Sequence, residues 1–122
     1  AGVEDGMQMR DFVYVKDAAA VLAHFYTTAL SGKPTANGIY NIGTGEARSF
    51  KDLATNVMKS MGREPDITYI DMPQDLQGKY QYFTEAKMLK LADAGYTEKF
   101  HTLEEGVRDY VQNYLLQADP YC

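Results

Sequence analysis

The stretch that most constrains this chain is Arg10–Asp17, which reads Arg-Asp-Phe-Val-Tyr-Val-Lys-Asp. Its central residues, Phe12 to Val15, are aromatic or β-branched, and these types suit a half-buried strand. Asp17 precedes an alanine-rich run, where its carboxylate can accept hydrogen bonds from the N–H groups of a first helical turn. We therefore predict a strand over 12–15 and a helix from about residue 18, with Asp17 as its N-cap.

Arg10, at the edge of this strand, has two interpretations. A guanidinium held rigidly there can bind phosphate, because its planar fork donates two parallel charge-assisted hydrogen bonds. Most arginines are instead solvated or paired on a protein surface, and Asp11 is an adjacent partner. Side-chain chemistry alone leaves both roles open for Arg10.

Capping and turn residues predict an α/β order for the rest of the chain. Ser49 with Asp52 and Thr102 with Glu105 have the spacing of capping boxes, which makes Glu104 and Glu105 helix-start charges. We expect helices over about 18–30, 50–61, 85–94 (capped by Thr84) and 103–117, and short strands over 38–42 and 67–70. A right-handed crossover would make these two strands parallel. His24, on a strongly apolar helix, is expected in the core.

Gly43-Thr44-Gly45 follows the first of these expected strands. A Gly-x-Gly turn after a strand can bind phosphate, but the third glycine of a dinucleotide fingerprint is absent here, since Ala47 and Arg48 stand in its place. The sequence therefore favours a plain tight turn over a cofactor loop.

The segment Gln74–Thr84 mixes polar and aromatic residues around Gly78, where another group can approach the backbone closely. A tyrosine has an apolar face and a polar tip, which suits a ligand that is part ring and part hydroxyl or phosphate. Tyr80 and Tyr82 could equally cover the edge of a core. Both roles stay open for Tyr80.

Composition narrows the function classes. The 122 residues can form one domain, and 12 basic against 17 acidic side chains give a net charge of −5, with no basic patch interleaved with aromatics. A nucleic-acid partner is therefore not expected. The single cysteine, Cys122, and the lack of metal-spaced Cys/His sets predict no disulfide, no metal site and a cytoplasmic protein. No membrane is expected, because the longest apolar stretch, 18–26, cannot span one, and the acidic opening 1–6 is no signal peptide and suits a piece of a larger protein.

Arg10–Asp17 resembles the RDFVYVxD segment of the ADP-glyceromanno-heptose 6-epimerases, extended short-chain dehydrogenases/reductases that act on nucleotide-activated sugars. Residues 77–84 are similar to that family's KGRYQAFT segment, and NIGTG, AGY and TLEEGV extend the likeness along the chain. The resemblance implies that 1–122 is the C-terminal, substrate-binding portion, in which Arg10 and Tyr80 contact an ADP-sugar. Lys79 stands where an arginine is often found, so the charge is kept but the bidentate fork is lost.

The same resemblance implies an enzyme that uses NADP to oxidise C6 of the heptose and return the hydride to the opposite face, in the synthesis of a lipopolysaccharide core precursor. That chemistry needs a glycine-rich dinucleotide turn and a tyrosine followed four residues later by a lysine. This sequence has neither. We therefore assign no catalytic or cofactor-binding residue here, place NADP in an absent N-terminal Rossmann domain, and expect an inactive fragment of a homo-oligomeric enzyme.

Two other classes stay open. One is another nucleotide-sugar enzyme of the same superfamily, such as a UDP-hexose 4-epimerase or a dTDP-sugar dehydratase. The other is a non-catalytic interaction module that docks a partner through its acidic surface and its first helix. That helix, 18–30, is apolar nearly all round, so we expect it to pack against a domain missing from this chain.

Overall fold

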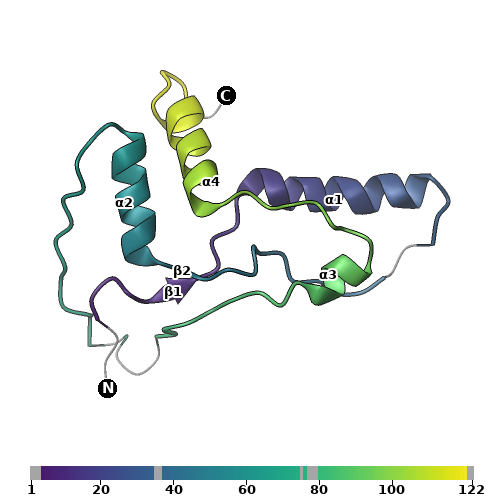
Figure 1. Cartoon of the computed structure of the whole chain (residues 1–122), viewed down its shortest axis with the longest axis horizontal. Helices are drawn as coiled ribbons and strands as arrows, with labels where there is room; N and C mark the ends of the chain where they lie inside the picture. Colours follow the sequence, from purple (N-terminus) through teal and green to yellow (C-terminus); the bar gives the residue numbers. More distant parts are fainter. Residues whose placement is uncertain (1–3, 35–36, 75, 77–79, 121–122) are drawn as a thin grey trace.

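The centre of the structure is a short strand, β1 (Met9–Arg10), which is hydrogen-bonded on both sides. This computed structural model describes residues 4–34, 37–74, 76 and 80–120. On one side β1 pairs antiparallel with β2 (Arg48–Ser49), with Met9 opposite Ser49. On the other side Met9 forms a parallel bridge to Phe83. Figure 1 shows both strands at the base of the helices.

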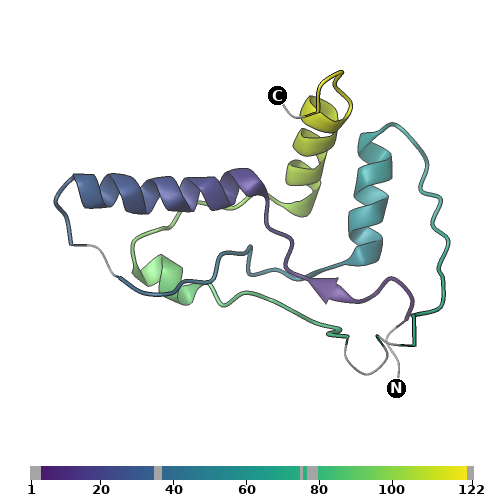
Figure 2. The same cartoon turned by 180° about the vertical axis from the view of Figure 1, so that it is seen from behind.

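The helices are α1 (Val15–Leu30), α2 (Phe50–Ser60), α3 (Leu89–Asp93) and α4 (Leu103–Tyr110), and α4 continues as a π-helical turn, η1 (Val111–Leu115). α2 and α4 stand side by side, whereas α1 extends away from them, as Figures 1 and 2 show from opposite sides. α3 lies beside α1, where Val21, Leu91 and Tyr96 form a buried cluster. His24 is half-buried at the edge of this cluster, edge-on to the rings of Phe25 and Tyr96.

The expected N-caps of two helices and the expected end of a third are confirmed. Ser49 and Asp52 form a capping box at the start of α2, and Thr102 and Glu105 form one at the start of α4. The last residue of α1, Leu30, also agrees with the prediction, and Gly32 follows it with a φ of +70°, a conformation that glycine adopts without strain.

The strand predicted over 12–15 and the N-cap predicted at Asp17 are wrong. The carbonyl of Tyr14 already accepts hydrogen bonds from the N–H groups of Asp17 and Ala18, so α1 begins at Val15 and Tyr14 is its N-cap. Asp17 lies in the first turn and is 5% exposed. Its carboxylate accepts hydrogen bonds from the backbone N–H of His101 (3.0 Å) and contacts Nδ1 of that ring (2.6 Å). Asp17 therefore fastens α1 to the segment before α4.

The strands predicted over 38–42 and 67–70 are also wrong. Both segments are irregular, and no strand among the described residues pairs with either of them. A β-rich sequence becomes a strand only when another strand pairs with it. Ile39 and Ile70 show the consequence, since their side chains are 89% and 88% exposed. The predicted parallel crossover is therefore not formed.

The helix predicted over 85–94 is shorter than expected and lacks its Thr84 cap, because α3 begins only at Leu89. The residues before it are held in other contacts. Ala86 donates its N–H to Asp11, and the Glu85 carboxylate accepts the N–H of Ala47 (3.0 Å). These long-range hydrogen bonds compete with a helical first turn.

No helix among the described residues is long and apolar enough to cross a bilayer.

Asp11, directly after β1, has the carboxylate that accepts the most hydrogen bonds among the described residues. Its oxygens accept from the N–H and hydroxyl of Thr44 and from the N–H groups of Gly45 and Ala86, at 2.6–3.0 Å. Burial raises the pKa of this carboxyl, but the hydrogen bonds outweigh burial and leave the pKa below its usual value. The turn predicted at 43–45 thus binds the carboxylate of Asp11.

This lowered pKa predicts an acid-dependent stability. The unfolded chain protonates Asp11 near pH 4, whereas the folded chain does so at lower pH, so the contribution of Asp11 is full above about pH 5 and is lost as pH falls through the folded pKa. Asp11→Asn should lower the free energy of unfolding by about 1–3 kcal/mol at pH 7 and reduce its loss between pH 5 and pH 3, measured by urea unfolding. Asp93→Asn is the control, since this exposed carboxylate accepts no hydrogen bond from the described residues. An unchanged pH profile in Asp11→Asn would contradict the assignment.

Candidate functional site

The structure brings the two predicted site residues together. The guanidinium of Arg10 lies 5.1 Å from the centre of the Tyr80 ring and 5.8 Å from that of Phe50. It donates hydrogen bonds to the carbonyls of Met9 (2.8 Å) and Gln81. Contacts with two rings and two carbonyls fix the plane of this side chain. Two of the five N–H groups of a guanidinium suffice for these bonds, so further donors remain for an anion.

Arg10 does not pair with Asp11, contrary to the surface interpretation. The two side chains have different partners, since Asp11 binds the 44–45 turn and Ala86 while Arg10 contacts rings and carbonyls. Arg10 is half-buried and therefore lies in the body of the molecule.

Tyr80 is half-buried and meets the ring of Tyr82 edge-on, with 5.9 Å between ring centres. It follows Gln77, Gly78 and Lys79, which lie outside the described residues, so the role considered for Lys79 is not addressed by the structure. The side chain therefore has both an aromatic neighbour and a cation within reach.

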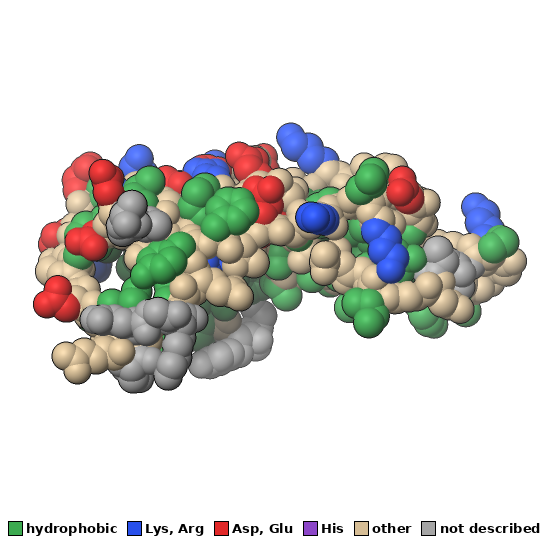
Figure 3. Space-filling model, turned by 90° about the horizontal axis from the view of Figure 1, so that it is seen from below, with side chains coloured by type: hydrophobic (Ala, Val, Ile, Leu, Met, Phe, Trp, Pro, Cys, Tyr) green, Lys and Arg blue, Asp and Glu red, His purple; other side chains and the backbone are tan. Residues whose placement is uncertain are grey.

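Tyr80 and Phe50, the two rings beside Arg10, line an apolar groove of about 1030 Å³. One wall is the apolar face of α2, and the other is the irregular segment 67–73. Arg10 is not among the described residues that line this groove. A groove of this size accommodates an organic ligand. Figure 3 shows the molecule from below, with hydrophobic side chains reaching the surface along much of its length.

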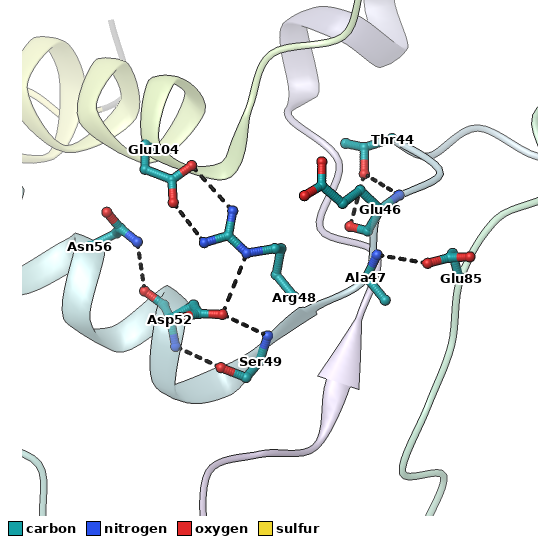
Figure 4. Close-up of polar contacts among 9 residues, drawn as sticks. All are labelled: Thr44, Glu46, Ala47, Arg48, Ser49, Asp52, Asn56, Glu85 and Glu104. Carbon is teal, nitrogen blue, oxygen red and sulfur yellow. Dashed lines mark hydrogen bonds and ion pairs between the residues drawn. The ribbon is translucent and has the colours of Figure 1, made fainter.

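A second polar cluster, shown in Figure 4, ties β2 to two helices. The guanidinium of Arg48 pairs with both oxygens of Glu104 (2.7 and 3.2 Å) and lies 3.4 Å from the Asp52 carboxylate. These contacts raise the pKa of Arg48 and lower that of Glu104, chiefly through their shared hydrogen bonds. Arg48 is therefore committed to holding α4 beside α2.

A third cluster joins the start of α1 to α4. Asp109 accepts hydrogen bonds from Lys16 (2.6 Å), Asn113 (2.7 Å) and the hydroxyl of Tyr14. These hydrogen bonds lower the pKa of Asp109, and the bond from Lys16 has the largest effect. Burial and the hydrogen bond to Asp109 raise the pKa of Tyr14 to about 12. The sequence offers no signal for this cluster, because Tyr14 and Lys16 precede Asp109 by 95 and 93 residues.

Within the described residues, no group of three or more His, Cys, Asp or Glu side chains is placed to hold a metal ion.

Comparison with known proteins places this geometry in context. The chain is 54% identical over 117 residues to an ADP-L-glycero-D-manno-heptose-6-epimerase of Nitratidesulfovibrio vulgaris strain DP4. The matched region covers 96% of the chain and 35% of that relative. It is 49% identical over 126 residues to the enzyme of the same name from Fusobacterium nucleatum, covering 98% of the chain and 36% of that protein. No family model matches the chain. The chain spans about a third of the length of these curated relatives.

Two solved structures share the fold. One is RMD from Pseudomonas aeruginosa in complex with NADPH, with a TM-score of 0.63 at 22% identity over 89% of this chain and 33% of that one. The other is TunA, an NAD-dependent NDP-hexosamine 5,6-dehydratase of tunicamycin biosynthesis, with a TM-score of 0.55 at 22% identity over 88% of this chain and 32% of that one. This likeness supports the predicted α/β class, with short strands and four helices.

The sequence identity relates this chain to about one third of the length of the ADP-L-glycero-D-manno-heptose-6-epimerases.

Proposed function

We propose that residues 1–122 are the C-terminal, substrate-binding part of an enzyme that inverts C6 of the heptose in ADP-glycero-manno-heptose. The identity of 54% across almost the whole chain carries this proposal. The contact between Arg10 and Tyr80 supports it, because one cation and one phenol beside an apolar groove suit a sugar nucleotide. The product would serve lipopolysaccharide core synthesis in the cytoplasm.

Arg10 and Tyr80 are the binding residues of this proposal. The guanidinium would neutralise the diphosphate through N–H groups that Met9 and Gln81 do not use. Tyr80 would pack and hydrogen-bond over the same region of the ligand. Both contacts are remote from the reacting carbon, so they contribute binding energy and hold the sugar in place.

NADP, which would accept a hydride from C6 and return it to the other face, is assigned to the rest of the protein. The Gly-x-Gly turn of this chain does not fit a dinucleotide phosphate, since the N–H groups of Thr44 and Gly45 already bind Asp11. The division implies that this chain binds substrate weakly by itself and catalyses nothing, and that the intact enzyme is a homo-oligomer.

Arg10→Ala in the full-length enzyme should raise the KM for the ADP-sugar by roughly 10- to 100-fold and change kcat less, because a hydrogen bond to a charged group contributes about 1.5–3 kcal/mol. Arg10→Lys should fall between wild type and Arg10→Ala, since the charge stays while the planar fork is lost. Steady-state kinetics measures both variants.

Arg63→Ala is the matched control, because this exposed arginine follows α2 at the far end from Arg10. Unchanged KM and kcat in Arg10→Ala would remove Arg10 from the site. The same assay with UDP- and dTDP-sugars tests the alternative of another nucleotide-sugar enzyme, which would prefer one of those substrates.

The partner of the exposed side of α1 is, in this proposal, the dinucleotide-binding domain of the same polypeptide. Val15, Leu22, Tyr26 and Leu30 are each about two-thirds exposed, at i, i+7, i+11 and i+15 along one side of the helix. The opposite side carries Asp17 and Val21, which are buried. An apolar stripe of this kind marks a contact surface, and about two thirds of the length of the relatives lies outside this chain. A non-catalytic module would instead use this stripe to dock another protein.

Leu22→Asp should therefore lower the Tm of the full-length protein by roughly 4–20 °C. Loss of a buried leucine costs about 2–5 kcal/mol, and each kcal/mol shifts Tm by about 2–4 °C in a larger domain. Ala20→Asp adds the same charge on another side of α1 and should change Tm less. Equal shifts for the two variants, measured by calorimetry, would argue against a covered stripe.

A further inference from the structure

Asp11 joins the two segments that flank β1. Its Oδ1 accepts from the N–H (2.7 Å) and hydroxyl (2.6 Å) of Thr44, and its Oδ2 accepts from the N–H of Gly45 (2.9 Å) and of Ala86 (3.0 Å). Four donors fill the acceptor positions of a carboxylate. Thr44 and Gly45 precede β2, whereas Ala86 follows the Tyr80 segment, so one side chain fastens both flanks at the end of β1.

The flank that carries Tyr80 is held to β1 by only a few other bonds. Met9 donates its N–H to the carbonyl of Tyr82 (2.8 Å) and accepts the N–H of Thr84 (3.1 Å), and Arg10 donates to the carbonyl of Gln81. In so short a ladder a shift of one residue would turn every side chain to the other face. A shift of two would place Tyr82 where Tyr80 now contacts Arg10. Beyond Thr84, this flank is held by the bond from the Ala86 N–H to Asp11 and by the bond from the Ala47 N–H to the Glu85 carboxylate (3.0 Å), and only the first of these ends directly after β1.

Gly43 leaves the room that this arrangement needs. A Cβ atom at this position would lie 2.5 Å from Oδ2 of Asp11 and 2.6 Å from the Cβ of Ala86. Any larger residue would therefore push apart the carboxylate and the segment that it holds. Because Gly43 has no side chain, the three segments can meet at the Asp11 carboxylate.

We propose that Asp11 is a positioning residue for the sugar-nucleotide site: by fixing the register of residues 80–86 against β1, it holds the Tyr80 ring over the Arg10 guanidinium. The positioning of Tyr80 by Asp11 rests on the hydrogen bonds described above, and the effect on substrate binding rests on the proposed function.

The first readout is the geometry itself, measured in the full-length protein with ¹⁵N-labelled arginine. A ring close to a guanidinium shifts its Nε–H resonance, which is assigned by its loss in Arg10→Lys, and Tyr80→Leu gives the value without the ring. We expect Asp11→Asn, Asp11→Ala and Gly43→Ala to move the resonance towards the Tyr80→Leu value. Asp11→Asn has the shape of the native side chain but turns an NH₂ group towards at least one of the bound donors.

Two controls separate positioning from general destabilisation. Glu105→Ala removes a capping bond at the start of α4 (2.8 Å to Thr102), which involves no residue of β1 or of its two flanks, and should leave the Arg10 resonance in place. Formate has the same three heavy atoms that Asp11→Ala removes. It should restore the resonance of that variant, whereas chloride at equal ionic strength should not.

The second readout is kinetic. Asp11→Ala should raise the KM for the ADP-sugar about five- to tenfold with a smaller change in kcat, and formate should reverse the rise. Adding Asp11→Ala to Arg10→Ala should raise KM little further, because both changes disable one contact.

An Arg10 resonance that stays at its wild-type position in both Asp11→Asn and Gly43→Ala would overturn the inference, and so would an equal shift in Glu105→Ala. If the resonance shifts as expected but the wild-type protein does not turn over ADP-sugars, the positioning role stands and the proposed function fails.

Discussion

The fold depends on a strand of two residues that is hydrogen-bonded on both edges. Met9 pairs with Ser49 on one side and bridges to Phe83 on the other, and Arg10 pairs with Arg48. An isolated two-stranded pair is only marginally stable in water, and here α2 follows β2 directly while α4 is tied to β2 through Arg48 and Glu104. The side chains of Arg10 and Asp11 add further contacts to the segments on both sides of β1. The backbone pairing of β1, the hydrogen bonds to Asp11 and the candidate site therefore belong to one connected structure.

Local signals in the sequence predict the helices well, because a cap needs only residues three positions apart. The Ser49 and Thr102 capping boxes and the end of α1 are found where expected. The failures are all long-range. Nothing near Asp17 indicates that His101 will donate to its carboxylate, and nothing near residue 85 indicates that Asp11 will hold the N–H of Ala86. The predicted strands failed for the same reason, since pairing depends on a partner elsewhere.

The candidate site also combines features that the sequence indicates with contacts that it does not. The residue types at Arg10 and Tyr80 allowed a binding role and a structural role, and the family resemblance selected the first. The structure places the two side chains in contact but also gives Arg10 structural partners, namely Phe50 and two carbonyls. The two roles are compatible, because a guanidinium has five donors and the contacts that orient it use only some of them. The sequence indicates only a surface pairing of Asp11 with Arg10, because the groups that donate to the Asp11 carboxylate are more than 30 residues away.

The surface of the chain indicates how such a site would be completed. Its accessible area is 9020 Å², whereas a compact monomer of 13.7 kDa would expose about 6,600 Å². The excess includes Leu22 and Tyr26 on α1, together with Ile39 and Ile70, whose segments have β-type sequences but no paired strand among the described residues. Apolar side chains in extended, unpaired segments are stable when a further layer covers them. The α1 stripe and the two irregular segments are therefore explained if the rest of the polypeptide covers them. This agrees with the proposal for the enzyme, in which the sugar nucleotide is held here and the hydride chemistry is performed by the rest of the polypeptide.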